Sequence, residues 1–261
     1  MSLDTTDQIR FFRRIRTALG HAAEVPRAAG QLFAEGPSAE DLQMLDRTDK
    51  RSTTDRQALL ERLIEAGKPI NLKVVSVPDL AAASSAVAGL VAEKQPEWGE
   101  AKSVAAWRHP LIDRLGLEEA LARLQVPLRV TQPINPSAGR ECDQAERDRQ
   151  RAGIIASFIG VTAADFCMAD TATLVMRNRP GQPRSVALVP SIHVAVITLD
   201  QILVDMKELF ALLRWDERFR QEGLSNYMSF ISGPSKTADI EATMVHGAHG
   251  PREVHLIVVA E

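Results

Sequence analysis

The polar residues best placed to do chemistry stand in GVTAADFCMADTATL, residues 160–174, between two apolar runs. The segment contains two aspartates and three threonines, namely Asp165, Asp170, Thr162, Thr171 and Thr173. In open α/β sheets ligands bind where strands end, so we expect these side chains near the rim of a sheet. Asp170 could serve as a general base, a nucleophile or a cation ligand. The alternative is that both aspartates occupy turn and cap positions, which this residue type favours.

A histidine interrupts the apolar run VPSIHVAVI, residues 189–197. In one interpretation His193 is catalytic or orients a ligand, because imidazole changes its charge near neutral pH. This interpretation predicts an activity that titrates near neutral pH and is lost in His193→Gln. In the other interpretation His193 is a core residue with one hydrogen-bond partner.

Three arginines stand in RNRPGQPR, residues 177–184, where a Pro-Gly pair favours a tight turn. Arg177, Arg179 and Arg184 could form a clamp for an anion above the crevice, because guanidinium groups bind carboxylates and phosphates through paired hydrogen bonds. A solvated loop between two strands is the alternative, since such loops are commonly charged.

A fourth polar segment is ISGPSKTADIEATMVHGAHGP, residues 231–251. Its Gly-Pro pair is expected to turn the chain out of a strand, and residues 236–245 have the pattern of a helix. The unpaired N–H groups at the start of that helix, beside Ser235, Lys236 and Thr237, would form an anion site. Asp239 would either accept hydrogen bonds from those N–H groups or orient hydroxyl groups of a ligand.

Composition limits the partners that the chain can have. Its 261 residues suit a globular protein, and a net charge of −3 offers no positive field for nucleic acid. Two cysteines are too few for an iron–sulphur cluster, and His246 and His249 lack a third metal ligand, so we expect no metal or cofactor in this chain. Neither a signal peptide nor an apolar run of membrane-spanning length is present in the sequence, so we expect a cytoplasmic protein with no membrane partner.

Helix and strand signals alternate through the first half of the chain. A helix is predicted over residues 6–19, and residues 21–51 are predicted to form an extended arm that could reach a second subunit of a homo-oligomer. We therefore divide the chain into residues 1–51, a helix and arm, and residues 52–261, a single α/β domain.

The expected elements of that domain follow from apolar spacing and turn residues. We predict helices from 54, over 78–94, over 117–125, from 141 and over 203–221, and strands at 71–77, 102–107, 127–132, 159–162, 171–176, 185–190, 192–197, 227–232 and 254–259. Strand–helix–strand alternation indicates parallel pairing in the first half.

Three segments occur in a characteristic order and spacing: GVTAADFCMADTATLVM, RSVALVPSIHVAVI and ISGPSKTADIEATMVHGAHGPREVHLIV. With them the chain resembles the LUD-domain family and, within it, the lactate utilization protein C group. The resemblance is strongest over residues 159–258. It implies an α/β fold of the NagB/RpiA/CoA-transferase type, with a mostly parallel central sheet flanked by helices and here an extended N-terminal helical arm.

The resemblance also implies a role in oxidising L-lactate to pyruvate, together with partner proteins that carry iron–sulphur clusters. This chain would be a cluster-free accessory subunit, not itself catalytic, that binds a small carboxylate or another anion. The motif positions carried over are Thr162, Asp165, Asp170, Thr173, His193, Gly233, Ser235, Thr237, Asp239, His249 and Gly250. Many members of the family that the chain resembles carry Glu-Ser/Thr-Gly-Thr where this chain has Asp-Thr-Ala-Thr at 170–173, so the acid is one methylene shorter and a glycine is missing.

Two other functions stay open. One is a stand-alone enzyme acting on an acyl-CoA or a sugar phosphate, with Asp170 and His193 as its catalytic pair. The other is an anion- or nucleotide-sensing regulator that uses residues 233–237 and the arginine-rich turn. All three functions require remote loops to converge at one cavity.

Overall fold

The computed structural model describes residues 5–20, 36–97, 99, 101–134, 140–222, 227–238 and 244–260. The chain divides into two compact units, Met1–Glu40 and Asp41–Glu261. Helix α1 (Thr5–Ala18) lies in the first unit and confirms the helix predicted over residues 6–19. The second unit contains the sheets.

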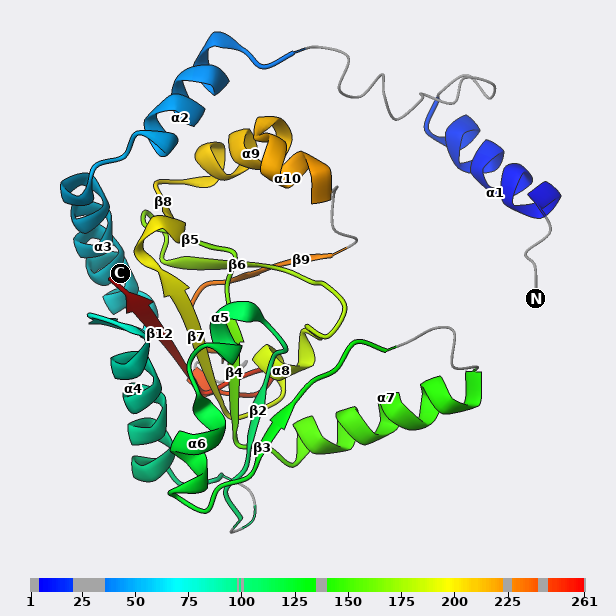
Figure 1. Cartoon of the computed structure of the whole chain (residues 1–261). Helices are drawn as coiled ribbons and strands as arrows, with labels where there is room; N and C mark the ends of the chain where they lie inside the picture. Colours follow the sequence, from blue (N-terminus) through cyan, green and yellow to red (C-terminus); the bar gives the residue numbers. More distant parts are fainter. Residues whose placement is uncertain are drawn as a thin grey trace. The chain divides into compact units, whose positions relative to one another are not determined.

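Helices and strands alternate along the second unit (Figure 1). Its helices are α2 (Ala39–Asp49, which begins at the border of the units), α3 (Thr53–Gly67), the 3-10 helix η2 (Lys68–Ile70), α4 (Leu80–Glu93), α5 (Pro110–Asp113), α6 (Leu117–Ala122), α7 (Arg140–Ile155), α8 (Ser185–Leu188), the 3-10 helix η4 (Leu199–Gln201), α9 (Met206–Trp215) and α10 (Glu217–Glu222). Its strands are β1 (Leu72–Val77), β2 (Val104–Ala106), β3 (Leu128–Val130), β4 (Ile159–Ala163), β5 (Phe166–Met168), β6 (Thr173–Arg177), β7 (Ile192–Thr198), β8 (Ile202–Leu203), β9 (Met228–Ile231), β10 (Lys236–Ala238), β11 (Met244–His246) and β12 (Glu253–Val259).

A six-stranded parallel sheet forms the centre of the second unit, in the order β1-β12-β7-β4-β2-β3. Its central strands β4, β7 and β12 are almost entirely buried, as expected of apolar strands covered on both faces. The mixed α/β class with a mostly parallel central sheet is confirmed. Strands β1 and β2 are parallel as predicted, but β12, β7 and β4 lie between them.

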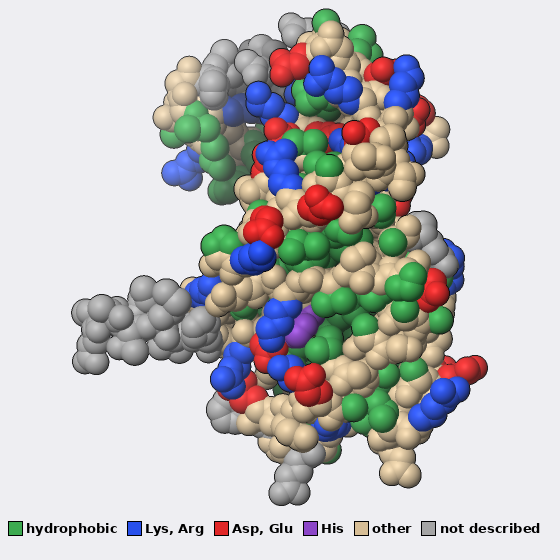
Figure 2. Space-filling view, turned by 90° about the vertical axis from the view of Figure 1, so that its left-hand side faces the viewer, with side chains coloured by type: hydrophobic (Ala, Val, Ile, Leu, Met, Phe, Trp, Pro, Cys, Tyr) green, Lys and Arg blue, Asp and Glu red, His purple; other side chains and the backbone are tan. Residues whose placement is uncertain are grey.

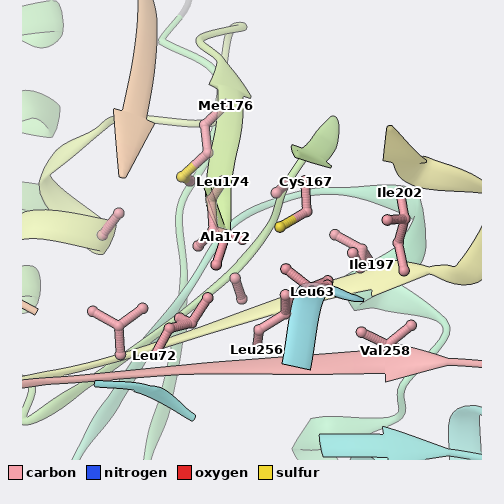
Figure 3. Packing of buried hydrophobic residues seen from close by; sticks show 14 of the residues in the cluster. Leu63, Leu72, Cys167, Ala172, Leu174, Met176, Ile197, Ile202, Leu256 and Val258 are labelled. Atoms are coloured by element: carbon pink, nitrogen blue, oxygen red, sulfur yellow. The ribbon is translucent and has the colours of Figure 1, made fainter. Parts of the chain in front are cut away.

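A four-stranded mixed sheet, in the order β8-β5-β6-β9, packs on one face of the central sheet. The layer between the two sheets is apolar, and Figure 3 shows Leu63 of α3 beside Leu256 of β12 with Leu174 of β6 nearby. Burying a leucine side chain stabilises the fold by about 1.5 to 3 kcal/mol. Helices α4, α5 and α6 cover the other face of the central sheet, and α9 covers the outer face of the mixed sheet.

Three predictions of local structure are wrong. Residues 39–49 form α2 instead of an extended arm. No residue of α2 is fully buried, and a helix that buries no side chain needs no strong apolar stripe, so the sequence shows only a weak helical pattern there. Residues 185–188 form α8 instead of a strand, and Val186 N donates to Pro183 O (3.3 Å) to close its first turn. The helix predicted over 236–245 is an antiparallel pair, β10 with β11, although Asp239 and the rest of 239–243 lie outside the described residues.

Charges of both signs are interspersed on the surface. On the face shown in Figure 2, lysine and arginine side chains alternate with acidic ones, and hydrophobic side chains lie between them. No helix among the described residues is long and apolar enough to cross a membrane.

Candidate functional site

A cavity of about 300 Å³ opens at the carboxyl edge of the six-stranded sheet. His109 lines it three residues after β2, Asp165 two residues after β4 and Asp200 two residues after β7. The mixed sheet contributes Arg177, at the end of β6. We call this site the carboxyl-edge cavity. Its charged lining consists of Asp49, Arg56, Asp165, Arg177, Arg179, Asp200, Arg218 and Glu222, together with His109.

Asp165 is fixed in the wall of the cavity. Its carboxylate accepts hydrogen bonds from Arg177 N (2.7 Å), Arg177 Nε (3.1 Å) and Arg179 Nη2 (2.7 Å). Its own N–H donates to Val175 O (2.8 Å), which ties the segment between β4 and β5 to β6. Asp165 is therefore a predicted site residue that lies in the cavity, while ligand binding by it stays a prediction.

Arg177 and Arg179, the arginine pair, come from the turn that the sequence singled out as an anion clamp. The Arg177 side chain is only 5% exposed, and its guanidinium stacks on the Phe219 ring at 5.0 Å. Burial disfavours the charged form of Arg179, but its hydrogen bonds to Asp165 and Glu222 outweigh this and raise its pKa. The third arginine of the turn, Arg184, lies apart from the cavity lining with its guanidinium 4.7 Å from the Tyr227 ring.

His109 is a cavity residue that the sequence interpretation missed. Its Nδ1 accepts a hydrogen bond from Leu111 N (3.1 Å) at the start of α5. Burial lowers the pKa of His109, which nearby Asp165 raises and Arg179 lowers. The ring is therefore neutral at pH 7, and because Nδ1 accepts, Nε2 carries the proton. The signal in the sequence was a His-Pro pair three residues after the end of a strand, at the edge where ligands bind.

The predicted turn at 170–173 lies elsewhere. Asp170 forms an ion pair with Arg62 of α3, and Thr171 Oγ1 lies 2.8 Å from Thr173 Oγ1. Thr173 in turn contacts Ser232 Oγ at 2.7 Å. Ala172 has a φ of 47°, a left-handed conformation that favours glycine. None of the residues of this turn is among the described residues lining the carboxyl-edge cavity.

His193 is a core residue. It is fully buried in β7, and its Nε2 lies 2.8 Å from Thr162 Oγ1. Burial, with a smaller contribution from His255, lowers the pKa of His193 to about 3, so the ring is neutral at pH 7. His193 is the second residue of β7, at the strand end opposite to the cavity. This geometry matches the core interpretation and not an acid–base role near neutral pH.

The described parts of the fourth polar segment, residues 233–238 and 244–250, contact each other. Ser235 Oγ accepts a hydrogen bond from His249 N (3.3 Å), and Ser235 N donates to Pro251 O (2.9 Å). A Cβ at Gly233 would lie 2.5 Å from Ile70 O, and one at Gly250 would lie 3.3 Å from Ser235 Cβ, so little space remains at either glycine. Lys236 and Thr237 lie in β10, not at a helix start, so the predicted helix-terminus anion site is wrong.

The predicted residues therefore meet only in part. Hydrogen-bond contacts link Thr173 with Ser232, Ser235 with His249, and Thr162 with His193. Asp165 and the arginine pair meet at the carboxyl-edge cavity, which contains neither Asp170 nor His193 among its described lining residues.

Comparisons with known proteins agree with the motif pattern. The family model described as LUD domain matches residues 60–259. A lactate utilization protein C of Halalkalibacterium halodurans is 32% identical over 161 residues, which cover 62% of this chain and 64% of that protein. A lactate utilization protein C of Shouchella clausii is 34% identical over 160 residues, which cover 61% and 63%. The chain thus spans less than two thirds of the length of these relatives. A crystal structure of a duf162 family protein from Deinococcus radiodurans is 18% identical, covers 80% of this chain and 99% of that one, and has a TM-score of 0.47.

Proposed function

Because the chain belongs to the LUD domain family, we propose that it acts in lactate utilisation and binds a small carboxylate in the carboxyl-edge cavity. Its similarity to proteins named lactate utilization protein C supports the first part. The arginine pair supports the second part, and it is the observation on which the proposal chiefly depends.

Two guanidinium groups side by side are suited to a carboxylate. Arg179 Nη2 and Arg177 Nη2 both reach one carboxylate oxygen of Glu222, at 2.9 and 3.0 Å. Planar guanidinium groups bind carboxylates with directed, charge-assisted hydrogen bonds. The volume of about 300 Å³ is at the lower limit of ligand pockets, which suits a small metabolite better than a coenzyme.

His109 gives the cavity a neutral donor. Its Nε2–H can donate a hydrogen bond to an oxygen on the carbon next to the carboxylate of a ligand. L-lactate has a hydroxyl oxygen at this position and pyruvate has a keto oxygen, so both could accept it. A donor that stays neutral adds no charge to a lining in which the described residues already include four arginines and four acidic residues.

Electron transfer in this proposal belongs to partner proteins with iron–sulphur clusters. Such clusters are held by four cysteines, and this chain has two. Cys167 lies in the core, where burial raises the pKa of its thiol. The proposed role of the chain is therefore that of an accessory subunit that holds the carboxylate.

Calorimetric titration of the protein with L-lactate and with pyruvate tests the proposal. Arg179→Met should weaken binding about ten- to a hundredfold, since a hydrogen bond to a charged group contributes about 1.5 to 3 kcal/mol. Arg220→Met is the matched control, because Arg220 is 57% exposed and pairs only loosely with Glu217 (3.7 Å). Equal affinity in the Arg179 variant and the wild type would refute the carboxylate site. Growth on L-lactate of a strain lacking the gene, restored by wild type and not by the Arg179 variant, tests the physiological role.

A further inference from the structure

Glu222 ends helix α10 with its carboxylate on the arginine pair. The pair is thus shared between two carboxylates that differ in how they are held. Asp165 is 10% exposed and accepts a backbone N–H as well as two side-chain N–H groups. Glu222 is 49% exposed and reaches the pair from the solvent side.

We propose that Glu222 occupies the place of the ligand carboxylate, and that a monocarboxylate enters the carboxyl-edge cavity by displacing it. The inference rests on the proposed function, because it presumes that the cavity binds a carboxylate. It adds which group occupies the arginine pair before a ligand binds and which ligand charge the site admits.

Charge balance supports an exchange of one carboxylate for another. Two guanidinium groups now face two carboxylates, so the cluster is neutral. A third carboxylate on the arginine pair would leave two guanidinium groups facing three anions in a partly buried place, which is costly. Displacement of Glu222 by a monoanion keeps the balance, whereas a dicarboxylate brings one negative charge too many.

Glu222 is the carboxylate that can leave. Asp165 could depart only by breaking the hydrogen bond to Arg177 N that also holds the chain between β4 and β5. Glu222 stands at the carboxyl end of its helix, where the helix dipole opposes a negative charge, so the arginine pair is what holds it. Released from the pair, its half-exposed side chain turns into water.

The inference predicts that removing the charge of Glu222 strengthens ligand binding. An internal competitor lowers the apparent affinity by the fraction of molecules in which the site is open. Glu222→Gln should therefore bind pyruvate at least about fivefold more tightly than the wild type. Glu217→Gln makes the same change on the same helix, but Glu217 is 69% exposed and faces Arg220, so its affinity should stay unchanged.

Calorimetric titration with pyruvate of the wild type, Glu222→Gln, Glu222→Ala, Glu217→Gln and Arg179→Met tests the inference. Tighter binding by both Glu222 variants, with the Glu217 variant unchanged, is the expected result. If Arg179→Met loses binding while the Glu222 variants bind no tighter than the wild type, the displacement is refuted and the carboxylate site stands. If Arg179→Met binds as the wild type does, or the wild type does not bind, the proposed function fails and the displacement with it.

Discussion

Asp165→Asn tests whether the arginine pair is held in place by a permanent carboxylate. Asp165 accepts three hydrogen bonds from Arg177 and Arg179, and the side chains of Asp165 and Arg177 are 10% and 5% exposed. Removing one partner of a buried ion pair costs about 3 to 5 kcal/mol, because the other charge stays buried. Arg179 is less buried and keeps Glu222, so we expect the lower value, about 3 kcal/mol.

Urea unfolding at pH 7, followed by circular dichroism, measures this loss. For a domain of this size about 3 kcal/mol corresponds to a fall in Tm of about 6 to 12 °C. Asp113→Asn is the matched control, since Asp113 and Arg108 form a pair that is 40% and 45% exposed. Such a pair contributes about 0 to 1 kcal/mol. If the two variants lose the same free energy of unfolding, Asp165 does not hold the pair and the account of the cavity is wrong.

Two further predictions concern the fold around the site. Gly160→Ala should lower the free energy of unfolding by at least about 3 kcal/mol, because its Cβ would lie 1.8 Å from the backbone oxygen of Val186. The control is Gly89→Ala in α4, whose Cβ would meet nothing within 4 Å and which should stabilise the protein by about 0.5 to 1 kcal/mol. Equal unfolding midpoints for the two variants would contradict this packing. Burial lowers the pKa of His193 from 6.5 to about 3, so the unfolded chain binds more protons between these pH values and stability falls on acidification, by up to about 1.4 kcal/mol per pH unit. His193→Gln should reduce that slope in unfolding measurements from pH 7 to 4, and an unaltered slope would show that the ring is not buried in the neutral form.

The parts of the fold that the sequence predicted well are those that local patterns decide. Strands β4, β7 and β12 are apolar runs because both of their faces are buried, and such runs are legible without knowing their neighbours. The run at 185–190 is also mostly apolar but forms α8. This helix lies between Pro183 and Pro190, and the backbone of Val186 packs directly over Gly160. The hairpin of β10 and β11 depends on pairing between segments, which the helix-like spacing of 236–245 does not reveal.

The site was predictable in the same partial way. Asp165 and the arginine pair come from neighbouring segments, so their approach follows from a short connection between β5 and β6. His109 and Glu222 reach the cavity from segments more than forty residues away from that connection in sequence. His109 lies at the cavity because the strand order places β2 beside β4. Glu222 lies there because Phe219 of α10 packs against Phe166.

A crystal structure of the protein soaked with pyruvate tests the central claim most directly. The account predicts pyruvate in the carboxyl-edge cavity, with its carboxylate on Arg177 and Arg179, its keto oxygen at His109 Nε2, and the Glu222 side chain turned into solvent. Pyruvate bound only outside this cavity, or a Glu222 carboxylate that stays on the arginine pair at saturating pyruvate, would contradict it.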